Sequence, residues 1–248
     1  MGLIEREVFS PGIISDLSEI SGSFEITNNN KRADEMMLIL KTEGFKELGC
    51  GTNRLCVVNK AYDEKLCFLI ALDKRGERDN NNEAYLTRDE ILKPHIAKVK
   101  ENTTLICAQE RFKKMTPKRF KKRREEYDKL IRELSKYFLI DDAGPLVWNN
   151  LGIDEETDEI KFIDYAYFCR IENLLKIKCD KCGGDLLYDK NLLYMKCANK
   201  KCGKHFTFAQ LKGQYIQDPL VEMGYQVFDN ETQEEDKERK TIEDWLNN

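Results

Sequence analysis

Residues 45–58 read FKELGCGTNRLCVV, and the expected architecture follows from this stretch and the runs on either side of it. Apolar residues fill 54–62 (RLCVVNKAY) and again 65–73 (KLCFLIALD), and the polar residues of AYDEK separate the two runs. Strand-like runs joined by a short polar turn are typical of a β-hairpin. Gly49 and Gly51 precede the hairpin and predict a turn into its first strand.

Helical periodicity appears on both sides of this hairpin. Residues 33–41 carry Met36, Met37 and Leu40 on one helical face. Apolar residues recur at intervals of three and four from 118 to 138, which is the clearest helical pattern in the chain. Residues 83–99 also have helical content, which Pro94 interrupts because proline lacks an amide donor.

Further strands are expected at 104–112 (TLICAQERF) and 159–168 (EIKFIDYAYF), the second bounded by the acidic turn DEETDE. Residues 1–33 contain SPG and TNNNKR, and they predict only short elements and a loop before the first strand. Strands surrounding helices without a repeating βαβ order indicate the α+β class.

Composition narrows the class of protein. No run approaches the eighteen or so apolar residues of a membrane span, and the first residues lack a secretory pattern, so a cytoplasmic protein that does not enter membranes is expected. The formal net charge of −4 gives no general attraction to nucleic acid. Charge is nevertheless uneven, because residues 113–124 (KKMTPKRFKKRR) are basic and residues 213–248 form an acidic tail.

Four of the nine cysteines have the spacing of a metal site. Two residues separate the first pair and four the second, glycine follows each pair, and DLLYDKNLLYMK between them predicts a hairpin. Four thiolates close a tetrahedral zinc site and leave no position for water, so the ion would be structural. The expected unit is a zinc ribbon over 173–212, with these ligands: Cys179, Cys182, Cys197 and Cys202. His205 is left out of this site.

The glycine stretch at 45–58 resembles the glycine-rich loop of protein kinases, in which backbone amides cover nucleotide phosphates. The motifs that follow are similar, in order, to those of small kinase-like proteins encoded by bacteriophages. FLIALDKRGERDNNNEAYL resembles their next strand and helix, TLICAQERFKKMT their hinge strand, DDAGPLVWNNLGI their catalytic loop and FIDYAYF their magnesium-binding strand. The resemblance covers roughly residues 36–170 and implies a two-lobed kinase-like body over 36–172, after an N-terminal extension over 1–35.

The resemblance also implies site residues. Asp142 takes the place of the base that accepts a substrate proton, and Asn150 and Asp164 take the places of the magnesium ligands. Gly49, Gly51 and Thr52 lie in the loop over the phosphates. Glu83 takes the place of the helix glutamate, and Glu110 lies in the segment that contacts adenine. The implied cofactors are therefore ATP and Mg²⁺, beside the structural Zn²⁺.

One position departs from the kinase pattern. The strand lysine that pairs with the helix glutamate and contacts phosphates falls at Leu69, which carries no charge. Lys60, Lys65 and Lys74 are the other lysines near enough in sequence to be considered. The usual catalytic-loop histidine and arginine are also absent, and Tyr165 and Ala166 follow the metal aspartate.

Three functions therefore remain open. The first is a phosphotransferase that moves a phosphoryl group from Mg-ATP to a protein or a small hydroxyl compound, in the host cytoplasm if a phage encodes the chain. The second is a catalytically dead scaffold that binds a host or virion protein partner, a role that Leu69 favours. The third is nucleic-acid binding through the zinc ribbon and the basic run, with strong salt dependence.

Overall fold

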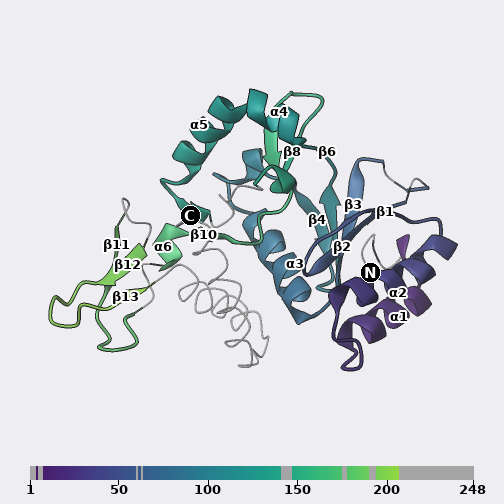
Figure 1. The fold of residues 1–248 in the computed structure, drawn as a ribbon, viewed down its shortest axis with the longest axis horizontal. Coiled ribbons are helices and arrows are strands. Elements are labelled where there is room, and N and C mark those ends of the chain that lie inside the picture. Colours follow the sequence, from purple (N-terminus) through teal and green to yellow (C-terminus); the bar gives the residue numbers. More distant parts are fainter. Residues whose placement is uncertain are drawn as a thin grey trace, which may run out of the picture.

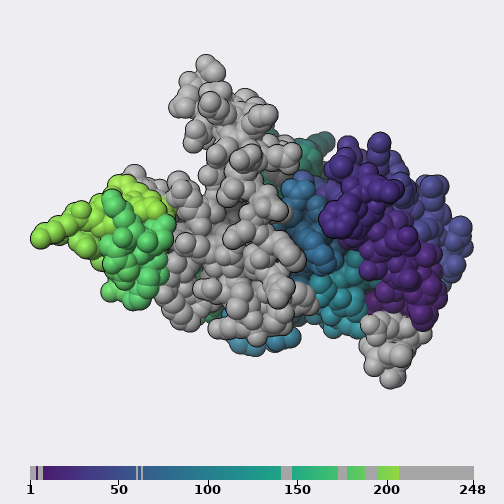
Figure 2. Space-filling model, turned by 90° about the horizontal axis from the view of Figure 1, so that it is seen from below, coloured from purple at the N-terminus to yellow at the C-terminus, as the bar shows by residue number. Residues whose placement is uncertain are grey.

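The computed structural model describes residues 4, 8–59, 61–62, 64–140, 147–174, 178–189 and 194–206. These residues form a mixed α+β structure whose strand ladders are all antiparallel, as the sequence predicts at that level (Figure 1). Two N-terminal helices lie at one end of the molecule and a small cysteine-bearing sheet lies at the other, in both views (Figure 2).

The first helix, α1 (Pro11–Gly22), was not expected from the sequence. The Ser10 hydroxyl accepts a hydrogen bond from the Ile13 amide, and Pro11 occupies the first turn. Serine followed by proline is a helix start, because the serine caps a free amide and the proline has none to satisfy. The prediction of short elements before residue 33 was therefore wrong about this segment.

The N-terminal sheet contains five strands in the order β1-β2-β3-β5-β4. Their bounds are Lys46–Cys50 for β1, Arg54–Val58 for β2, Leu66–Ala71 for β3, Val99–Asn102 for β4 and Ile106–Glu110 for β5. The predicted hairpin is confirmed, since β2 pairs with β3 and Cys56 lies opposite Leu69. Strand β5 pairs with both β3 and β4, so it lies inside the sheet.

Successive side chains of a strand point to opposite faces, so the sheet has two different environments. One face packs on α1 and on α2 (Asn29–Thr42), and this core includes Leu17, Met36 and Phe68. Residues of the predicted N-terminal extension thus share a core with the sheet. The other face carries Arg54, Cys56, Leu69 and Gln109, and the helix α3 (Lys74–Leu86) lies against it.

Helix α3 begins earlier than periodicity predicts and ends before Pro94. The Asp73 carboxylate caps its first turn by accepting hydrogen bonds from the amides of Arg75 and Gly76, 2.9 and 3.1 Å away. Pro94 lies in a separate 3-10 turn, Lys93–His95. The run of three asparagines in α3 leaves the helix without apolar periodicity, so the hydrophobic pattern does not predict it. The kinase resemblance does imply a helix at this place.

The C-terminal part begins with β6 (Lys113–Lys114), α4 (Pro117–Lys122) and α5 (Arg124–Leu134). A single helix over 118–138 was expected, but Arg123 leaves the helical conformation at φ −110° and ψ 17°. Its guanidinium pairs with Glu126 and with Asp158 of a distant turn. These tertiary contacts occur where the chain breaks between α4 and α5, and the apolar periodicity of the sequence does not predict this break.

Two small sheets complete this part. Strands β6, β8 (Leu151–Ile153) and β9 (Ile160–Phe162) form one, in the order β6-β8-β9, and β7 (Phe138–Ile140) pairs with β10 (Phe168–Arg170) in the other. A 3-10 turn, Val147–Asn150, leads into β8. Phe138, Phe162 and Phe168 belong to the buried core that α5 covers.

The short helix α6 (Ile171–Leu174) lies between β10 and the cysteine-bearing sheet. This sheet consists of β11 (Leu186–Asp189), β12 (Tyr194–Cys197) and β13 (His205–Phe206). The predicted hairpin between the cysteine pairs is present as β11 and β12. Leu186, Met195 and Phe206 pack against Leu139 and Cys169, so the sheet shares a small core with β7 and β10.

Asp89 connects the segment after α3 to β10. Its carboxylate accepts hydrogen bonds from the amides of Ile91 and Leu92, 3.0 and 3.1 Å away, and from Nε of Arg170. Burial raises the pKa of Asp89, but the hydrogen bonds with Arg170 and the amides outweigh burial and hold that pKa below its usual value.

We expect Asp89→Asn to lower the free energy of unfolding by about 1–3 kcal/mol at pH 7, because Arg170 loses a charged partner. Since the folded-state pKa lies below the unfolded-state value of about 3.9, this stabilisation is present above the unfolded-state pKa and is lost as the pH falls through the folded-state pKa. Urea unfolding at a series of pH values should show the variant and the unmodified protein converging in acid. Asp128→Asn, in an exposed pair with Arg124, is the control and should change stability by less than about 0.5 kcal/mol. Equal effects of the two substitutions at pH 7 would contradict this assignment.

Candidate functional site

A cleft of about 1440 Å³ lies between the N-terminal sheet and the β8–β9 region. Its walls bring together residues that are far apart in the sequence. Six of the positions singled out by the kinase resemblance line it: Gly49, Gly51, Thr52, Glu110, Asn150 and Asp164. Glu83 lies behind the wall and is fully buried. Asp142 lies outside the described residues.

The glycine turn joins β1 to β2 at the edge of this cleft. The Gly51 amide donates a hydrogen bond to the Arg54 carbonyl oxygen, 2.9 Å away, which closes the turn. A Cβ atom added at Gly49 would meet no atom within 4 Å. The end of β1 therefore leaves open space beside the Gly49 backbone, which a ligand in the cleft can approach.

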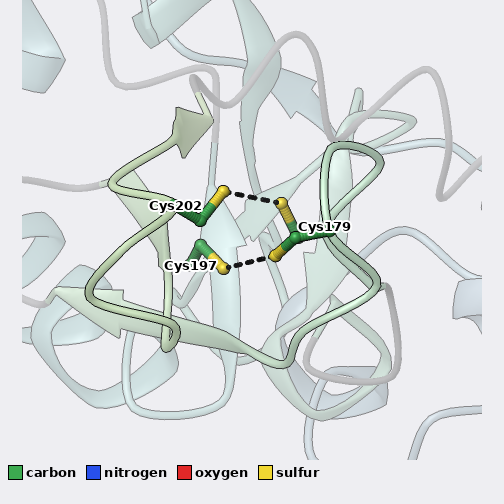
Figure 3. Close-up of side chains that lie close together, drawn as sticks. Cys179, Cys197 and Cys202 are labelled. Carbon is green, nitrogen blue, oxygen red and sulfur yellow. Dashed lines mark hydrogen bonds between the residues drawn. The ribbon is translucent and has the colours of Figure 1, made fainter.

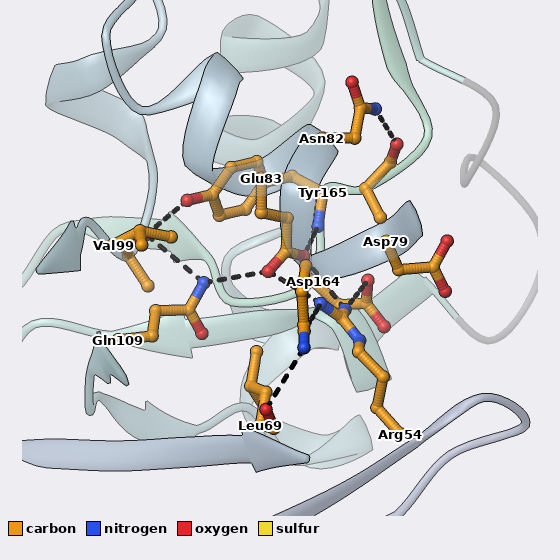
Figure 4. A network of polar contacts seen from close by, with 12 residues as sticks. Arg54, Leu69, Asp79, Asn82, Glu83, Val99, Gln109, Asp164 and Tyr165 are labelled. Atoms are coloured by element: carbon orange, nitrogen blue, oxygen red, sulfur yellow. Dashed lines mark hydrogen bonds and ion pairs between the residues drawn. The ribbon is translucent and has the colours of Figure 1, made fainter. Parts of the chain in front are cut away.

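Arg54, the first residue of β2, forms an ion triad with Glu83 of α3 and Asp164 (Figure 4). Its Nη1 lies 2.8 Å from Oε2 of Glu83, and its Nη2 lies 2.9 Å from Oε1 of Glu83 and 2.9 Å from Oδ1 of Asp164. Burial by itself lowers the pKa of Arg54, but the charges of Glu83 and Asp164 outweigh burial and hold that pKa well above its usual value. Arg54 is therefore a permanent cation at the inner end of the cleft.

Further hydrogen bonds fix the Glu83 carboxylate. The Tyr165 amide donates to Oε1 at 3.0 Å, and Nε2 of Gln109 donates to Oε2 at 3.3 Å. Burial raises the pKa of Glu83, and the charge and hydrogen bonds of Arg54 oppose this rise. A buried carboxylate with several donors around it is positioned by its surroundings rather than by its own side-chain torsions.

Hydrogen bonds with Asn150 and Ala97 fix the segment that follows β9, residues 163–165. The amides of Ile163 and Asp164 donate to the Asn150 carbonyl oxygen, at 2.8 and 3.4 Å, so the two predicted magnesium ligands come from neighbouring backbone. The Tyr165 hydroxyl donates to the Ala97 carbonyl oxygen at 2.6 Å. The Asp164 side chain is 46 % exposed and faces the cleft, as a residue that binds a ligand must.

Neither Lys65 nor Lys74, the two described lysines that were considered from the sequence, takes the place of the missing strand lysine. Lys65 and Lys74 are each 78 % exposed and pair with Glu156 and Glu77. Lys60 lies outside the described residues. Sequence reasoning missed Arg54, whose one signal is a lone charge at the start of the apolar run RLCVV.

The second candidate site is the cysteine cluster (Figure 3). All four sulfur atoms of Cys179, Cys182, Cys197 and Cys202 lie within 4.8 Å of one another. Sγ of Cys179 lies 3.7 Å from Sγ of Cys202, and Sγ of Cys182 lies 3.4 Å from Sγ of Cys197. Tetrahedral zinc with bonds of about 2.3 Å separates its sulfur ligands by about 3.8 Å, so the cluster can hold a metal ion such as zinc.

The backbone around the sulfurs explains the glycines. Gly183 and Gly203 adopt φ values of 68° and 60°, which residues other than glycine rarely adopt. A Cβ atom at Gly184 would lie 3.3 Å from the Cys197 sulfur and 3.4 Å from the Cys182 sulfur. The small residues thus allow the two turns to close around one ion.

The thiols of the cluster differ in acidity. Burial raises the pKa of Cys197 to about 12. A hydrogen bond with the Gly184 backbone and another with Cys197 lower the pKa of Cys182 to about 7. Thiolates are the ligands of zinc, so binding of the ion must displace the protons that the sulfurs otherwise share.

In the basic run, Lys113, Arg119 and Arg123 pair with acidic residues of the β8–β9 turn. His205 is exposed in β13 opposite Lys196 and is not part of the cysteine cluster. The acidic tail over 213–248 lies outside the described residues.

No family model and no curated protein matches this chain. Among the described residues, no helix combines the length and the apolar character that crossing a membrane requires.

Proposed function

We propose that the cleft binds ATP with Mg²⁺ and that residues 36–172 form a kinase-like, two-lobed body. The observation that carries the proposal is that six residues chosen from sequence motifs alone line one cleft, with the ion triad of Arg54, Glu83 and Asp164 at its inner end. Convergence of separate motifs on one concave site is the main structural criterion for a candidate binding site.

The order of the elements supports the same proposal. Protein kinases place a glycine-rich loop over the phosphates, a helix glutamate against a cation, and an aspartate after a strand to bind Mg²⁺. Here the corresponding places are the β1–β2 turn, Glu83 in α3 and Asp164 after β9. We also propose that the chain is related to the small kinase-like proteins encoded by bacteriophages.

The reaction that fits such a cleft is phosphoryl transfer to a hydroxyl group of a protein or small molecule. Asn150 and Asp164 would hold Mg²⁺, which neutralises phosphate charge, and Asp142 would accept the proton of the attacking hydroxyl. The second candidate is a scaffold that binds a protein partner without catalysis. Leu69 favours it, because this buried, uncharged side chain stands where the kinase pattern has the phosphate-binding strand lysine.

For the cysteine cluster we propose a structural Zn²⁺ in a zinc ribbon. All four ligands are cysteines, and four thiolates leave no open coordination position for substrate or water. The ion would therefore stabilise residues 178–206 rather than take part in a reaction.

Thermal unfolding with and without Mg-ATP tests the nucleotide proposal. At a concentration about 100-fold above Kd, binding to the folded state alone adds about 2.7 kcal/mol, which corresponds to a midpoint rise on the order of 5 °C. We expect Asp164→Asn to remove most of this rise, because the variant loses the metal-binding charge. Glu156→Gln is the matched control, since Glu156 is a carboxylate at the exposed rim of the same cleft.

No rise in the unmodified protein would contradict nucleotide binding and favour the scaffold. A rise that both variants retain would contradict the role of Asp164.

A further inference from the structure

At the inner end of the cleft the buried cation is Arg54, whereas the kinase pattern has a strand lysine there. Leu69 of β3 stands at the lysine position and is buried, so its side chain can neither carry charge nor donate. Arg54 comes from the neighbouring strand β2 and is only 8 % exposed. The kinase glycine pattern G-x-G-x-x-G places its third glycine at Arg54, so the same substitution that interrupts the glycine motif introduces the charge.

Register explains how Arg54 reaches the lysine's place. Arg54 lies opposite Ala71, and Cys56 lies opposite Leu69, so these residues project from one face of the sheet. Leu69 is two residues along β3 from the position opposite Arg54. A long arginine side chain from β2 can therefore bring its charge to the region that a side chain at 69 would occupy.

Arg54 makes two kinds of contact: a fixed one with Glu83 and one with Asp164 that a ligand could replace. Both terminal nitrogens bind Glu83, which is fully buried and held by Tyr165 and Gln109. The Nη2 contact to Asp164 is different, because the Asp164 side chain is 46 % exposed to the cleft. A ligand that takes Asp164 as a metal ligand would free this donor to face the cleft.

We propose that Arg54 supplies the phosphate-binding charge of this cleft in place of the absent strand lysine, anchored by Glu83 and exchanging its contact with Asp164 for a phosphate oxygen. Guanidinium groups bind phosphate through directed, charge-assisted hydrogen bonds. With Asp164 engaged as a metal ligand, Nη2 of Arg54 would keep its hydrogen bond to Glu83 and present its second hydrogen to a phosphate oxygen. This inference rests on the proposed function and assigns one of its components.

Affinities for Mg-ATP and for adenosine, measured by calorimetry, separate phosphate recognition from the shape of the pocket. Arg54→Met keeps length and removes charge, and we expect it to weaken Mg-ATP binding about 10- to 100-fold, as loss of a charged hydrogen bond does. Adenosine carries no phosphate, so its affinity should change by no more than about twofold. Arg54→Met with Leu69→Lys should recover part of the lost Mg-ATP affinity, because the new lysine occupies the same face.

Arg54→Met leaves Glu83 buried without its partner and can prevent folding. The double variant Arg54→Met with Glu83→Gln removes both charges and provides a neutral background for the same two titrations. Mg-ATP affinity that is unchanged in both variants, or adenosine affinity that falls as much as Mg-ATP affinity, would overturn the role of Arg54. Failure of the unmodified protein to bind either ligand would overturn the proposed function itself, and the inference with it.

Discussion

Removal of zinc from the cysteine cluster should unfold residues 178–206 and leave the rest of the protein folded. The three short strands share a small core, so we expect the proposed zinc ion to provide much of the folding free energy of this sheet. Structural zinc in small modules contributes about 10–16 kcal/mol of apparent binding free energy at pH 7. The rest of the described protein has two larger cores of its own, and only β7 and β10 contribute buried residues, Leu139 and Cys169, to the small core of this sheet.

Two measurements check this prediction. Elemental analysis of the purified protein should give one zinc per chain. Hydrogen exchange after chelation should lose protection over 178–206 and, to a smaller extent, in β7 and β10, which share the core of this sheet. Cys182→Ser should abolish stoichiometric zinc, because serine does not replace a thiolate ligand. Cys50→Ser is the matched control: Cys50 is also an exposed cysteine but lies outside the cluster, so that variant should retain zinc. Retention of one zinc by Cys182→Ser would contradict a four-cysteine site.

Gly76→Ala should destabilise the protein by about 1–3 kcal/mol or more, and it should also remove the nucleotide binding that we propose. Alanine normally stabilises a helix relative to glycine by about 1 kcal/mol, so the expected sign is the reverse of the helix rule. The reason is contact with the sheet: a Cβ atom at Gly76 would collide with the Asn53 carbonyl oxygen and lie 2.9 Å from Cα of Ala71. Both are backbone atoms, which cannot rotate away.

The collision would displace the first turn of α3 from β2 and β3. Because α3 carries Glu83 and β2 carries Arg54, the displacement would disturb the ion triad. Urea unfolding and the Mg-ATP thermal shift measure the two effects. Gly22→Ala is the control, since nothing lies within 4 Å of its added Cβ, and it should be neutral or slightly stabilising. A Gly76→Ala protein as stable as the Gly22→Ala protein would show that α3 does not pack this closely.

Elements encoded by local pattern were predicted well. The β2–β3 hairpin follows from two apolar runs around a polar turn, and the pairing of β11 with β12 follows from the hairpin between the cysteine pairs. Where the signal was capping rather than periodicity, prediction from periodicity failed. Helix α1 begins with a serine cap and proline, and the polar α3 shows no apolar face, so only the kinase resemblance implied a helix there. The break between α4 and α5 accompanies the contact of Arg123 with the distant Asp158, which local sequence cannot contain.

The sequence by itself determined the α+β class, the main hairpins and the four cysteines, because each depends on residues that are close together in the chain. Cysteines two and four residues apart can face one ion through the conformation of a single turn. Only the tertiary structure decided which cation meets Glu83 and Asp164. Arg54 lies 29 residues from the first and 110 from the second, so their pairing depends on how the sheet, α3 and the segment after β9 pack together.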